Sequence, residues 1–460
     1  MENPINNQES RLNEFIDNPQ KSLWKLALPM MFGMMVHSIY MLTDTAFIGR
    51  WVGGEALSAL GYVFPYMFII MGITFGLGAG ATAVIAKYIG MKSKEGADSA
   101  AGQTLLIGFF ISSIILCVTF LFKENIFTIQ NANADVIQQA LSYFRILSMG
   151  AVFLIFSMFV RSILSGEGDN LFPMKVLGVG TVLNIILDPI LIYHFNKVGR
   201  GIEGAAIATV ISHVVVCIIL IYYLAYKKTS YIDFSIKHLK FQPKVLKEIL
   251  AIGVPSSLSM VIMAMGAFIF NIILNSDDAV AAFNIGSRIE HLFFLPIISI
   301  SSALVTLVGM FYGANRFDLI EDIIRYGLKR SLLFASFCTI FFFSTSGYLL
   351  PFFTDSDSIK NITIQYFTIV CFSYPFVTIG MTSSRIMQGL GSGTPVLIIT
   401  LVRVILINAP LGLYLTRVLD KPIEYVWYCI LFSSFIASFM GLAWMNSIIK
   451  KHKSINSPVT

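Results

Sequence analysis

The chain has 460 residues, of which 56% are hydrophobic and only 13% are charged, whereas about 25% of residues in soluble domains are charged. This composition excludes an ordinary soluble protein and predicts one that is embedded in a lipid bilayer. The net charge of +6 is spread over the segments between apolar runs, which is typical of charges that set membrane orientation and not of a nucleic-acid-binding surface.

The first 22 residues are polar, and the first apolar run is already long enough to cross a membrane. We therefore expect no cleavable signal peptide, and we expect the first helix to remain as a span. Hydrophobic runs between charged or Gly/Pro/Asn-rich breaks predict an all-α polytopic membrane protein with twelve transmembrane helices. Their expected centres are near Gly33, Met71, Ile111, Gly150, Val182, Val215, Met260, Pro296, Ile340, Phe372, Leu406 and Ser438.

Lys and Arg concentrate on one side of the expected membrane, the side shared by the N-terminus and every second loop. That side includes Lys21, Lys25, Lys87, Lys92, Lys94, Arg161, Lys227, Lys228, Lys237, Arg325, Lys329, Arg385 and Lys450, whereas few basic residues lie opposite. By the positive-inside bias, both termini are expected to be cytoplasmic. The sequence thus predicts a multi-pass protein of the cell (cytoplasmic) membrane.

Short motifs recur at a fixed distance along the chain. Gly90 in "AKYIGMKSKEG" matches Gly313 in "GMFYGANRFDL", and Gly166 in "SGEGDNLFPM" matches Gly389 in "QGLGSGTPVL". Both 313 − 90 and 389 − 166 equal 223, which indicates two six-helix halves that cross the membrane in the same direction. The expected organisation is a cytoplasmic N-terminal segment (1–22), an N-lobe (23–226), a cytoplasmic linker (227–247), a C-lobe (248–449) and a cytoplasmic C-terminal tail (450–460).

Two carboxylates are expected within apolar runs of the first half. Asp44 lies in "HSIYMLTDTAF", and Asp188 lies in "LNIILDPILIY". A charged Asp at a helix centre costs about 2.5 to 3.5 kcal/mol on insertion scales. The second half lacks these acids, because its matching stretch "VILINAPLGLY" has Ala409 at the position of Asp188 while it keeps a proline.

Polar neighbours accompany the two acids. Asn184 lies four residues before Asp188, and Tyr40 and His37 lie four and seven residues before Asp44, on one helix face. Thr209 adds a hydroxyl in the sixth helix. Pro189 lacks an N–H, so the Ile185 carbonyl is expected to be free as another oxygen ligand.

Hard oxygen donors in this arrangement favour H⁺ or Na⁺ over a transition metal. A cation-coupling site is therefore predicted at Asp44, Asp188, Asn184, Thr209 and Tyr40, with Na⁺ as the metal that Asp44, Asn184, Asp188 and Thr209 would hold. The alternative is that each acid makes a structural hydrogen bond to a neighbouring helix, and that Asn184 and Thr209 are ordinary interhelical contacts.

The order and spacing of "PMMFGMMVHSIYMLTD", "GEGD" and "LNIILDP" resemble the multidrug and toxic compound extrusion (MATE) family, in its DinF-like prokaryotic branch. The resemblance covers nearly the whole chain, from about Lys21 to Ile449. It implies a V-shaped cleft between two bundles, export of amphipathic or cationic organic compounds, and influx of Na⁺ or H⁺ as the driving force. It also implies that Asp44, Asn184, Asp188 and Thr209, with Tyr40 alongside, form the cation site.

One departure from the wider family concerns the second half. Other branches place acids on helix seven, but Ile249 to Leu274 contains none. Helix eight instead carries "SRIEHLFFLP", in which Arg288 and Glu290 are secondary candidates, as is His37 in the first helix. The alternative for Arg288 and Glu290 is a purely structural pairing with other partners.

Two other functions are less consistent with the sequence. A flippase for lipid-linked oligosaccharides or polysaccharides would line its cavity with several Arg residues, but basic residues inside the expected spans are few: Arg145, Lys175, Arg288 and Arg403. An enzyme would need a catalytic constellation, and the chain has no HExxH and no GxSxG motif. We therefore predict a transporter that is not an enzyme.

Partners and cofactors follow from this prediction. We expect no cofactor apart from the coupling ion, no nucleic acid, small organic substrates, a lipid bilayer as surroundings, and a monomeric state. The five cysteines lie in apolar segments without CxxC spacing, and they are expected to be packing residues.

Overall fold

The computed structural model describes residues 4–122, 134–226, 231–233, 240–354 and 356–456. The regular elements in these ranges are helices, and twelve helical stretches are long and apolar enough to cross a membrane. Each of the twelve centres predicted from the sequence falls inside one of these stretches. The prediction of an all-α polytopic membrane protein is confirmed.

A short helix precedes six spanning helices in the first half of the molecule. The bounds are α1 (Pro4–Asp17), α2 (Pro19–Trp51), α3 (Gly54–Gly90), α4 (Lys94–Phe122), α6 (Ala134–Gly166), α7 (Leu171–Asn196) and α8 (Gly201–Tyr226). We call α2 to α8 the N-lobe. Leu12 and Phe15 of α1 are 4% and 0% exposed, so this helix is anchored to the rest of the protein by its apolar side.

The second half, which we call the C-lobe, also contains six spans, two of which are composite. Its bounds are α9 (Pro243–Leu274), α10 (Asp277–Gly313), α11 (Phe317–Leu349), η2 (Leu350–Phe352), α12 (Asp357–Val370), η3 (Cys371–Ser373), α13 (Tyr374–Gly389), α14 (Thr394–Leu401), η4 (Val402–Asn408), α15 (Ala409–Leu413), η5 (Tyr414–Val418) and α16 (Glu424–Asn456). One composite span joins α12, η3 and α13. The other runs from α14 to η5, and its segments η4 and η5 are π-helical.

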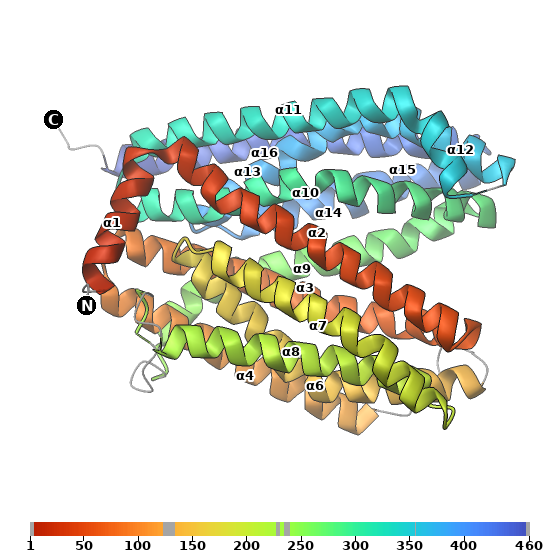
Figure 1. The fold of residues 1–460 in the computed structure, drawn as a ribbon. Coiled ribbons are helices and arrows are strands. Elements are labelled where there is room, and N and C mark those ends of the chain that lie inside the picture. The colour runs from red at the N-terminus through yellow and green to blue at the C-terminus, as the bar shows by residue number, and fades with distance from the viewer. Residues whose placement is uncertain (1–3, 123–133, 227–230, 234–239, 355, 457–460) are drawn as a thin grey trace.

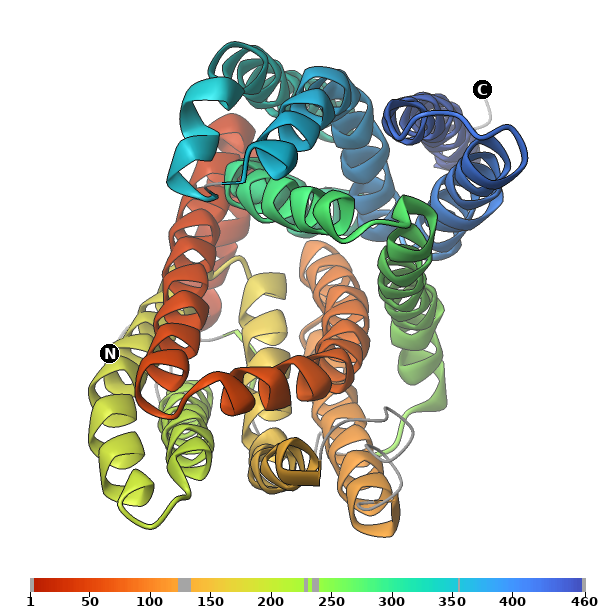
Figure 2. The ribbon, with the colours of Figure 1, turned by 90° about the vertical axis from the view of Figure 1, so that its right-hand side faces the viewer.

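The two lobes lie side by side, and both chain termini are at the same end of the molecule (Figure 1). Seen from the end opposite the termini, the N-lobe lies below and the C-lobe lies above (Figure 2). The red helix α2 and the green helix α9 lie at opposite sides of the junction between them. α2 packs against α7 of its own lobe and α10 of the other, and α9 packs against α14 and α3 in the same way.

The lobes are in tight contact at the end that carries the termini, which we call the termini face. A Cβ atom added to Gly90 would lie 2.0 Å from the Met310 carbonyl oxygen, and one added to Gly313 would lie 2.0 Å from the Lys87 carbonyl oxygen. Since 310 − 87 and 313 − 90 both equal 223, these two contacts are related by the sequence repeat. Only glycine permits the backbones of α3 and α10 to approach so closely.

Polar contacts close the same junction. Lys87 of α3 forms an ion pair with Glu248 of α9 at 3.0 Å. The Thr306 hydroxyl of α10 donates to the Ser165 carbonyl of α6 at 3.0 Å. The lobes are therefore joined at the termini face by backbone packing, an ion pair and a hydrogen bond.

Burial along α3 changes from one end to the other. Residues 76–86, near the termini face, are buried except for Ala79, whereas Leu57, Phe64 and Phe68 are 38%, 54% and 38% exposed. The central helix of the C-lobe, α10, follows the same trend, because residues 299–311 are buried except for Ser302 and Leu292 is 46% exposed. The lobes thus meet at the termini face and separate toward the opposite end, which gives the V-shaped cleft.

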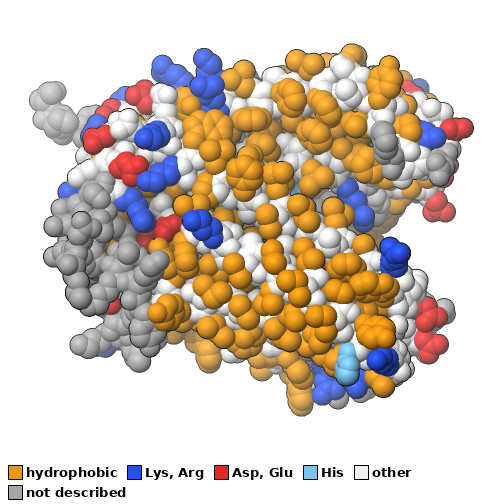
Figure 3. All heavy atoms as spheres, in the orientation of Figure 1, with side chains coloured by type: hydrophobic (Ala, Val, Ile, Leu, Met, Phe, Trp, Pro, Cys, Tyr) orange, Lys and Arg blue, Asp and Glu red, His pale blue; other side chains and the backbone are white. Residues whose placement is uncertain are grey.

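The space-filling view agrees with this arrangement. Its outline is indented between the two lobes on the side away from the termini, and hydrophobic side chains cover most of the middle of the visible face (Figure 3). Charged side chains gather mainly toward the two ends. A continuous apolar middle with polar ends is the surface expected of a protein in a bilayer.

Candidate functional site

The polar residues predicted for the N-lobe lie on three helices that pack together. α7 packs against both α2 and α8. Asp44 is on α2, Asn184 and Asp188 are on α7, and Thr209 is on α8. These four residues are 9%, 1%, 0% and 7% exposed, respectively, so the fold places all of them inside the lobe.

Direct contacts join these residues into one cluster, which we call the acid cluster. The side chains of Asp44 and Asp188 interact with each other although they come from different helices. The Asn184 amide Nδ2 donates to Asp188 Oδ1 at 3.3 Å. The Tyr40 hydroxyl and Thr209 Oγ1 lie 3.3 Å apart, and Tyr40 interacts electrostatically with Asp44 and Asp188, so all five predicted residues are brought together.

Three oxygens of the acid cluster lack a protein partner. Asp44 Oδ1, Asn184 Oδ1 and Asp188 Oδ2 are buried and accept no hydrogen bond from the described part of the chain. Neither aspartate forms an ion pair with a Lys or Arg in those ranges. Leaving a buried acceptor unsatisfied costs about 1–3 kcal/mol, and more for a charged group. The cluster is therefore incomplete without a cation or a proton.

The donor set determines which cations fit. Carboxylate, amide and hydroxyl oxygens are the ligands of hard cations. No group of three or more His, Cys, Asp or Glu that could hold a metal occurs among the described residues. Two carboxylates with neutral oxygens around them fit a monovalent ion such as Na⁺, or protons on the carboxylates themselves.

Pro189 lies inside α7, which continues from Leu171 to Asn196 without a break. Because proline has no N–H, the carbonyl of Ile185 loses its usual helical partner. The helix thus remains continuous, and the Ile185 carbonyl oxygen, three residues before Asp188, is available as an additional ligand. The first acid-bearing helix, α2, is likewise continuous through Pro29.

Tyr143 belongs to the acid cluster, but the sequence analysis did not identify it. This tyrosine is on α6, is 6% exposed, and lies within electrostatic reach of Asp44, Asp188 and Tyr40. The repeat contains a signal that could have found it, since Tyr366 follows Tyr143 by 223 residues.

A basic cluster of His37, Arg161 and His213 lies beside the acid cluster. The His37 ring stacks on the Tyr40 ring with centroids 5.5 Å apart, and Arg161 and His213 are electrostatic neighbours of His37. Sequence analysis grouped Arg161 with the loop charges, but this residue lies inside α6 and its buried Nε has no partner among the described residues. His37 precedes Asp44 by about two helical turns, which places it nearer to the termini face.

The two secondary candidates of the C-lobe are separate from the acid cluster. Glu290 is on α10, and its Oε1 accepts a hydrogen bond from the Tyr374 hydroxyl at 2.7 Å. Arg288, two residues earlier on the same helix, is exposed. The structure therefore does not pair Arg288 with Glu290.

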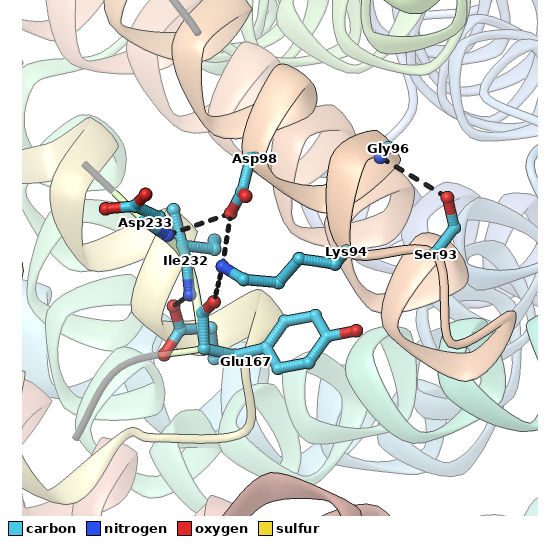
Figure 4. Close-up of polar contacts among 8 residues, drawn as sticks. Ser93, Lys94, Gly96, Asp98, Glu167, Ile232 and Asp233 are labelled. Carbon is cyan, nitrogen blue, oxygen red and sulfur yellow. Dashed lines mark hydrogen bonds and ion pairs between the residues drawn. The ribbon is translucent and has the colours of Figure 1, made fainter. Parts of the chain in front are cut away.

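The connection between the lobes is docked onto the N-lobe where the structure describes it. The predicted basic residues Lys227, Lys228 and Lys237 of this linker lie outside the described residues, whereas residues 231–233 lie beside the ends of α4 and α6 (Figure 4). The Asp233 N–H donates to Asp98 Oδ1 at 2.8 Å, and the Ile232 N–H donates to Glu167 Oε1 at 3.2 Å.

Lys94 completes this contact. Its ammonium group bonds to Asp98 Oδ1 at 2.9 Å and also to the Tyr231 carbonyl oxygen. Asp98 and Glu167 are only 4% and 2% exposed. Glu167, the first acid of the "GEGD" motif, thus holds the linker backbone, a role that could not be predicted from the motif alone.

Comparison with known proteins identifies relatives over nearly the full length. The MatE family model matches residues 29–190 and 255–414, which is one match in each lobe. The protein named "Probable multidrug resistance protein NorM" from Thermotoga maritima is 29% identical, with 90% of this chain and 89% of that protein covered.

Solved structures of transporters also match this chain over nearly its full length. A MOP superfamily transporter from Pyrococcus furiosus, described as having a binding pocket of reverse polarity that suggests a different function, matches with a TM-score of 0.89 and 30% identity. An outward-facing multidrug resistance MATE family transporter of the MOP superfamily matches with a TM-score of 0.88 and 30% identity. Both comparisons cover 95% of this chain and 97% of the other.

Proposed function

Because this chain belongs to the MATE family of membrane transporters, we propose that it exports amphipathic or cationic organic compounds by alternating access, in exchange for H⁺ or Na⁺. The coupling ion binds at Asp44 and Asp188, with Asn184, Thr209 and Tyr40 around them. The related proteins named for multidrug resistance support the class of substrate.

The observation that carries this proposal is the set of three unpartnered oxygens in the acid cluster. A purely structural role would give every buried oxygen of the two acids a hydrogen-bond donor, whereas Asp44 Oδ1 and Asp188 Oδ2 have none in the described part of the chain. Since these carboxylates lie in a low-dielectric interior, loading and unloading a cation changes the stability of their surroundings. An ion that binds one conformation more tightly than the other shifts the equilibrium between them.

The cycle follows from the shape of the molecule. With the termini in the cytoplasm, as the distribution of Lys and Arg favours, the cleft opens to the outside of the cell membrane. A cation from outside neutralises the acid cluster and displaces the bound compound. The lobes then separate at the termini face, where the ion leaves and new substrate enters. Each charge moved across the membrane supplies about 2.3 kcal/mol per 100 mV.

Substrate contacts are assigned to apolar side chains of the cleft. Apolar side chains of this kind are exposed along the C-lobe helix α9, where Met263, Met265 and Phe268 are 46%, 53% and 69% exposed, and those on the cleft side of the helix would contact the substrate. Methionine and aromatic side chains adapt to ligands of different shape, which suits a loosely specific exporter.

The test uses the purified full-length protein in liposomes that contain a cationic dye. Dye efflux is measured under an H⁺ gradient alone, a Na⁺ gradient alone, and no gradient, for the wild type and for Asp44→Asn and Asp188→Asn. We expect efflux driven by at least one gradient in the wild type and no gradient-driven efflux in either variant.

A matched control is Asp277→Asn, which removes an exposed carboxylate at the start of α10 and should transport like the wild type. Efflux that ignores both gradients would refute the antiporter. Gradient-driven efflux that survives in both acid-cluster variants would refute the assignment of the site.

A further inference from the structure

Three basic side chains meet inside the N-lobe, and the proposed exchange of cations does not use them. Arg161 comes from α6, and its electrostatic neighbours His37 and His213 come from α2 and α8. Their helices are packed together, since α8 contacts both α6 and α2. Each of the three side chains is partly exposed, so the basic cluster keeps surface that a solute can contact.

The side chain of Arg161 is directed into the lobe and away from the nearer membrane surface. Arg161 lies five residues before Gly166, where α6 ends at the termini face. Helical side chains lean toward the N-terminal end of their helix, which for α6 is the end far from the termini face. In agreement, its neighbours His37 and His213 lie near the middle of their helices. An arginine in a bilayer usually reaches the nearer surface instead.

The positive charge of Arg161 has no negative partner in the described part of the chain. It forms no ion pair there, and its buried Nε donates to no acceptor. The neighbour of His37 in the C-lobe, His291 on α10, is also basic. Arginine is always charged in proteins, and a charge inside a protein is normally paired. The basic cluster is therefore incomplete without an anion.

Tyr40 separates the basic cluster from the acid cluster. Its ring stacks on His37 with centroids 5.5 Å apart, while its hydroxyl is 3.3 Å from Thr209 Oγ1. His37 and Asp44 are seven residues apart on α2, which corresponds to a rise of about 10 Å. The N-lobe thus carries a positive and a negative site at a spacing that one small organic molecule can bridge.

We propose that the basic cluster binds the anionic group, a carboxylate or a phosphate, of a zwitterionic substrate. The planar guanidinium of Arg161 matches such a group with two parallel N–H bonds, and the rings of His37 and His213 donate to its remaining oxygens. The cationic part of the same molecule then lies toward Asp44 and Asp188. Because the coupling ion neutralises those two carboxylates, it weakens the binding of the cationic part and displaces the substrate.

This inference rests on the proposed export of amphipathic compounds and adds a charged contact to the apolar contacts of the substrate. A zwitterion fits the two clusters better than either ion alone. A simple cation would leave Arg161 unpaired. A simple anion would bind near Asp44 and Asp188 with no positive group of its own to offset their charge.

The test compares two fluorescent dyes that differ in one group. One is a rhodamine with a free carboxylate, which is a zwitterion at neutral pH, and the other is its methyl ester, which is a cation. Binding to the purified full-length protein in detergent is measured by fluorescence anisotropy. We expect the wild type to bind the free acid about tenfold more tightly than the ester, as hydrogen bonds to a charged group provide.

Variants of Arg161 assign this preference to the basic cluster. Arg161→Gln should lose about tenfold in affinity for the free acid and nothing for the ester, whereas Arg161→Lys should keep part of the preference because the charge remains. Arg145→Gln is the matched control, since it removes an exposed arginine of the same helix. Unchanged binding of the ester shows that a variant is folded.

Two results of the binding test would overturn the proposal. One is equal affinity of the wild type for the two dyes, and the other is a preference for the free acid that survives in Arg161→Gln. If Arg161→Gln binds neither dye, His213→Gln decides the question. That variant should lose affinity for the free acid alone, and an unchanged preference in it would also overturn the proposal.

Export distinguishes this inference from the proposed function. In liposomes under imposed ion gradients, Arg161→Gln should export the ester like the wild type and the free acid more slowly. A wild type that prefers the free acid in binding but exports neither dye would refute the proposed function and leave the anion site in place. If the wild type exports the ester alone and a short-chain phosphatidylcholine displaces the free acid, the cluster holds a lipid headgroup and the substrate assignment is wrong.

Discussion

The fifth span of each lobe descends from the same repeated segment, yet the two spans differ in backbone and in charge. In the N-lobe, α7 is one α-helix that passes through Pro189 and carries Asp188 with no exposed surface. In the C-lobe, Thr394 to Val418 alternates between α-helix and π-helix, and Ala409 occupies the matching position. π-Helical turns are rare in proteins, and those that occur often lie at functional sites.

The irregular backbone therefore lies in the lobe that lacks the acid pair. Its π-helical segment η4 contains Asn408, whose buried Oδ1 has no partner among the described residues. In the N-lobe a regular helix brings Asp188 to Asp44, so side chains alone form the site and the backbone remains regular. The C-lobe instead departs from regularity in its backbone, and its half-buried carboxylate Glu290 is on a different helix, α10.

The largest effect is expected when the N-lobe is given the uncharged residue of the C-lobe. Asp188→Ala should abolish gradient-driven efflux, because the cluster can no longer bind the ion differently in the two conformations. The measurement is dye efflux from liposomes under imposed ion gradients. Ala409→Ser, a polar change at the matching C-lobe position, is the control and should keep driven efflux. Equal driven transport by Asp188→Ala and the wild type would contradict the asymmetry.

The next largest effect is expected at the termini face, where the two lobes make equivalent glycine contacts. Gly313→Ala would place a Cβ atom 2.0 Å from the Lys87 carbonyl oxygen, and overpacking of this kind costs about 1–3 kcal/mol. Distances between spin labels on the two lobes should increase at the termini face. Gly178→Ala, at a helical glycine of α7 with nothing within 4 Å, should leave them unchanged. Wild-type distances in Gly313→Ala would argue against a tight junction.

The lobes also differ in their contacts with the linker, because the described contacts of the linker are to the N-lobe. Glu167→Ala should leave the Ile232 N–H without its acceptor, at a cost of about 1–2 kcal/mol. Amide hydrogen exchange at Ile232 and Asp233 should become faster, whereas Glu95→Ala should not change it. Unaltered exchange after loss of Glu167 would mean that the linker is held by other groups.

The smallest expected effect concerns a neutral member of the acid cluster. Thr209→Val removes the contact with the Tyr40 hydroxyl, and a neutral hydrogen bond contributes about 0.5–1.5 kcal/mol. The ion concentration for half-maximal efflux should rise several-fold while driven efflux persists. Thr400→Val is the control, because its hydroxyl bonds only within its own helix, to the Val396 carbonyl. A complete loss of coupling in Thr209→Val would show that its hydroxyl does more than support Tyr40.

The spans, the repeat and part of the site could be predicted from the sequence because each has a local signature. Long apolar runs mark the helices, and Gly90 and Gly313 mark the repeat. Spacing by four residues placed Asn184 and Asp188 on one face of a helix. The sequence analysis assigned Asp44 and Asp188 to one site, but no local pattern sets the contact between them, since it depends on how α2 and α7 pack.

What the sequence could not provide depends on helix rotation and tertiary contacts. Tyr143 and Arg161 lie near the ends of the apolar run of their helix, among other polar residues such as Ser142 and Ser162, and nothing local tells whether such a side chain faces lipid, the core or an acid. The π-helical turns of the eleventh span overlap both ends of "VILINAPLGLY", a stretch whose sequence predicts an ordinary helix with a proline. Docking of the linker on Glu167 joins segments 65 residues apart, which no local pattern encodes.

The crossing of α3 and α10 has a consequence for the symmetry of the two halves. Gly90 approaches Met310 while Gly313 approaches Lys87, so position i touches j and the duplicate of i touches the duplicate of j. Reciprocity of this kind is the property of an isologous interface between identical subunits. A chain of half this length would therefore carry at this crossing a surface that is complementary to a second copy of itself.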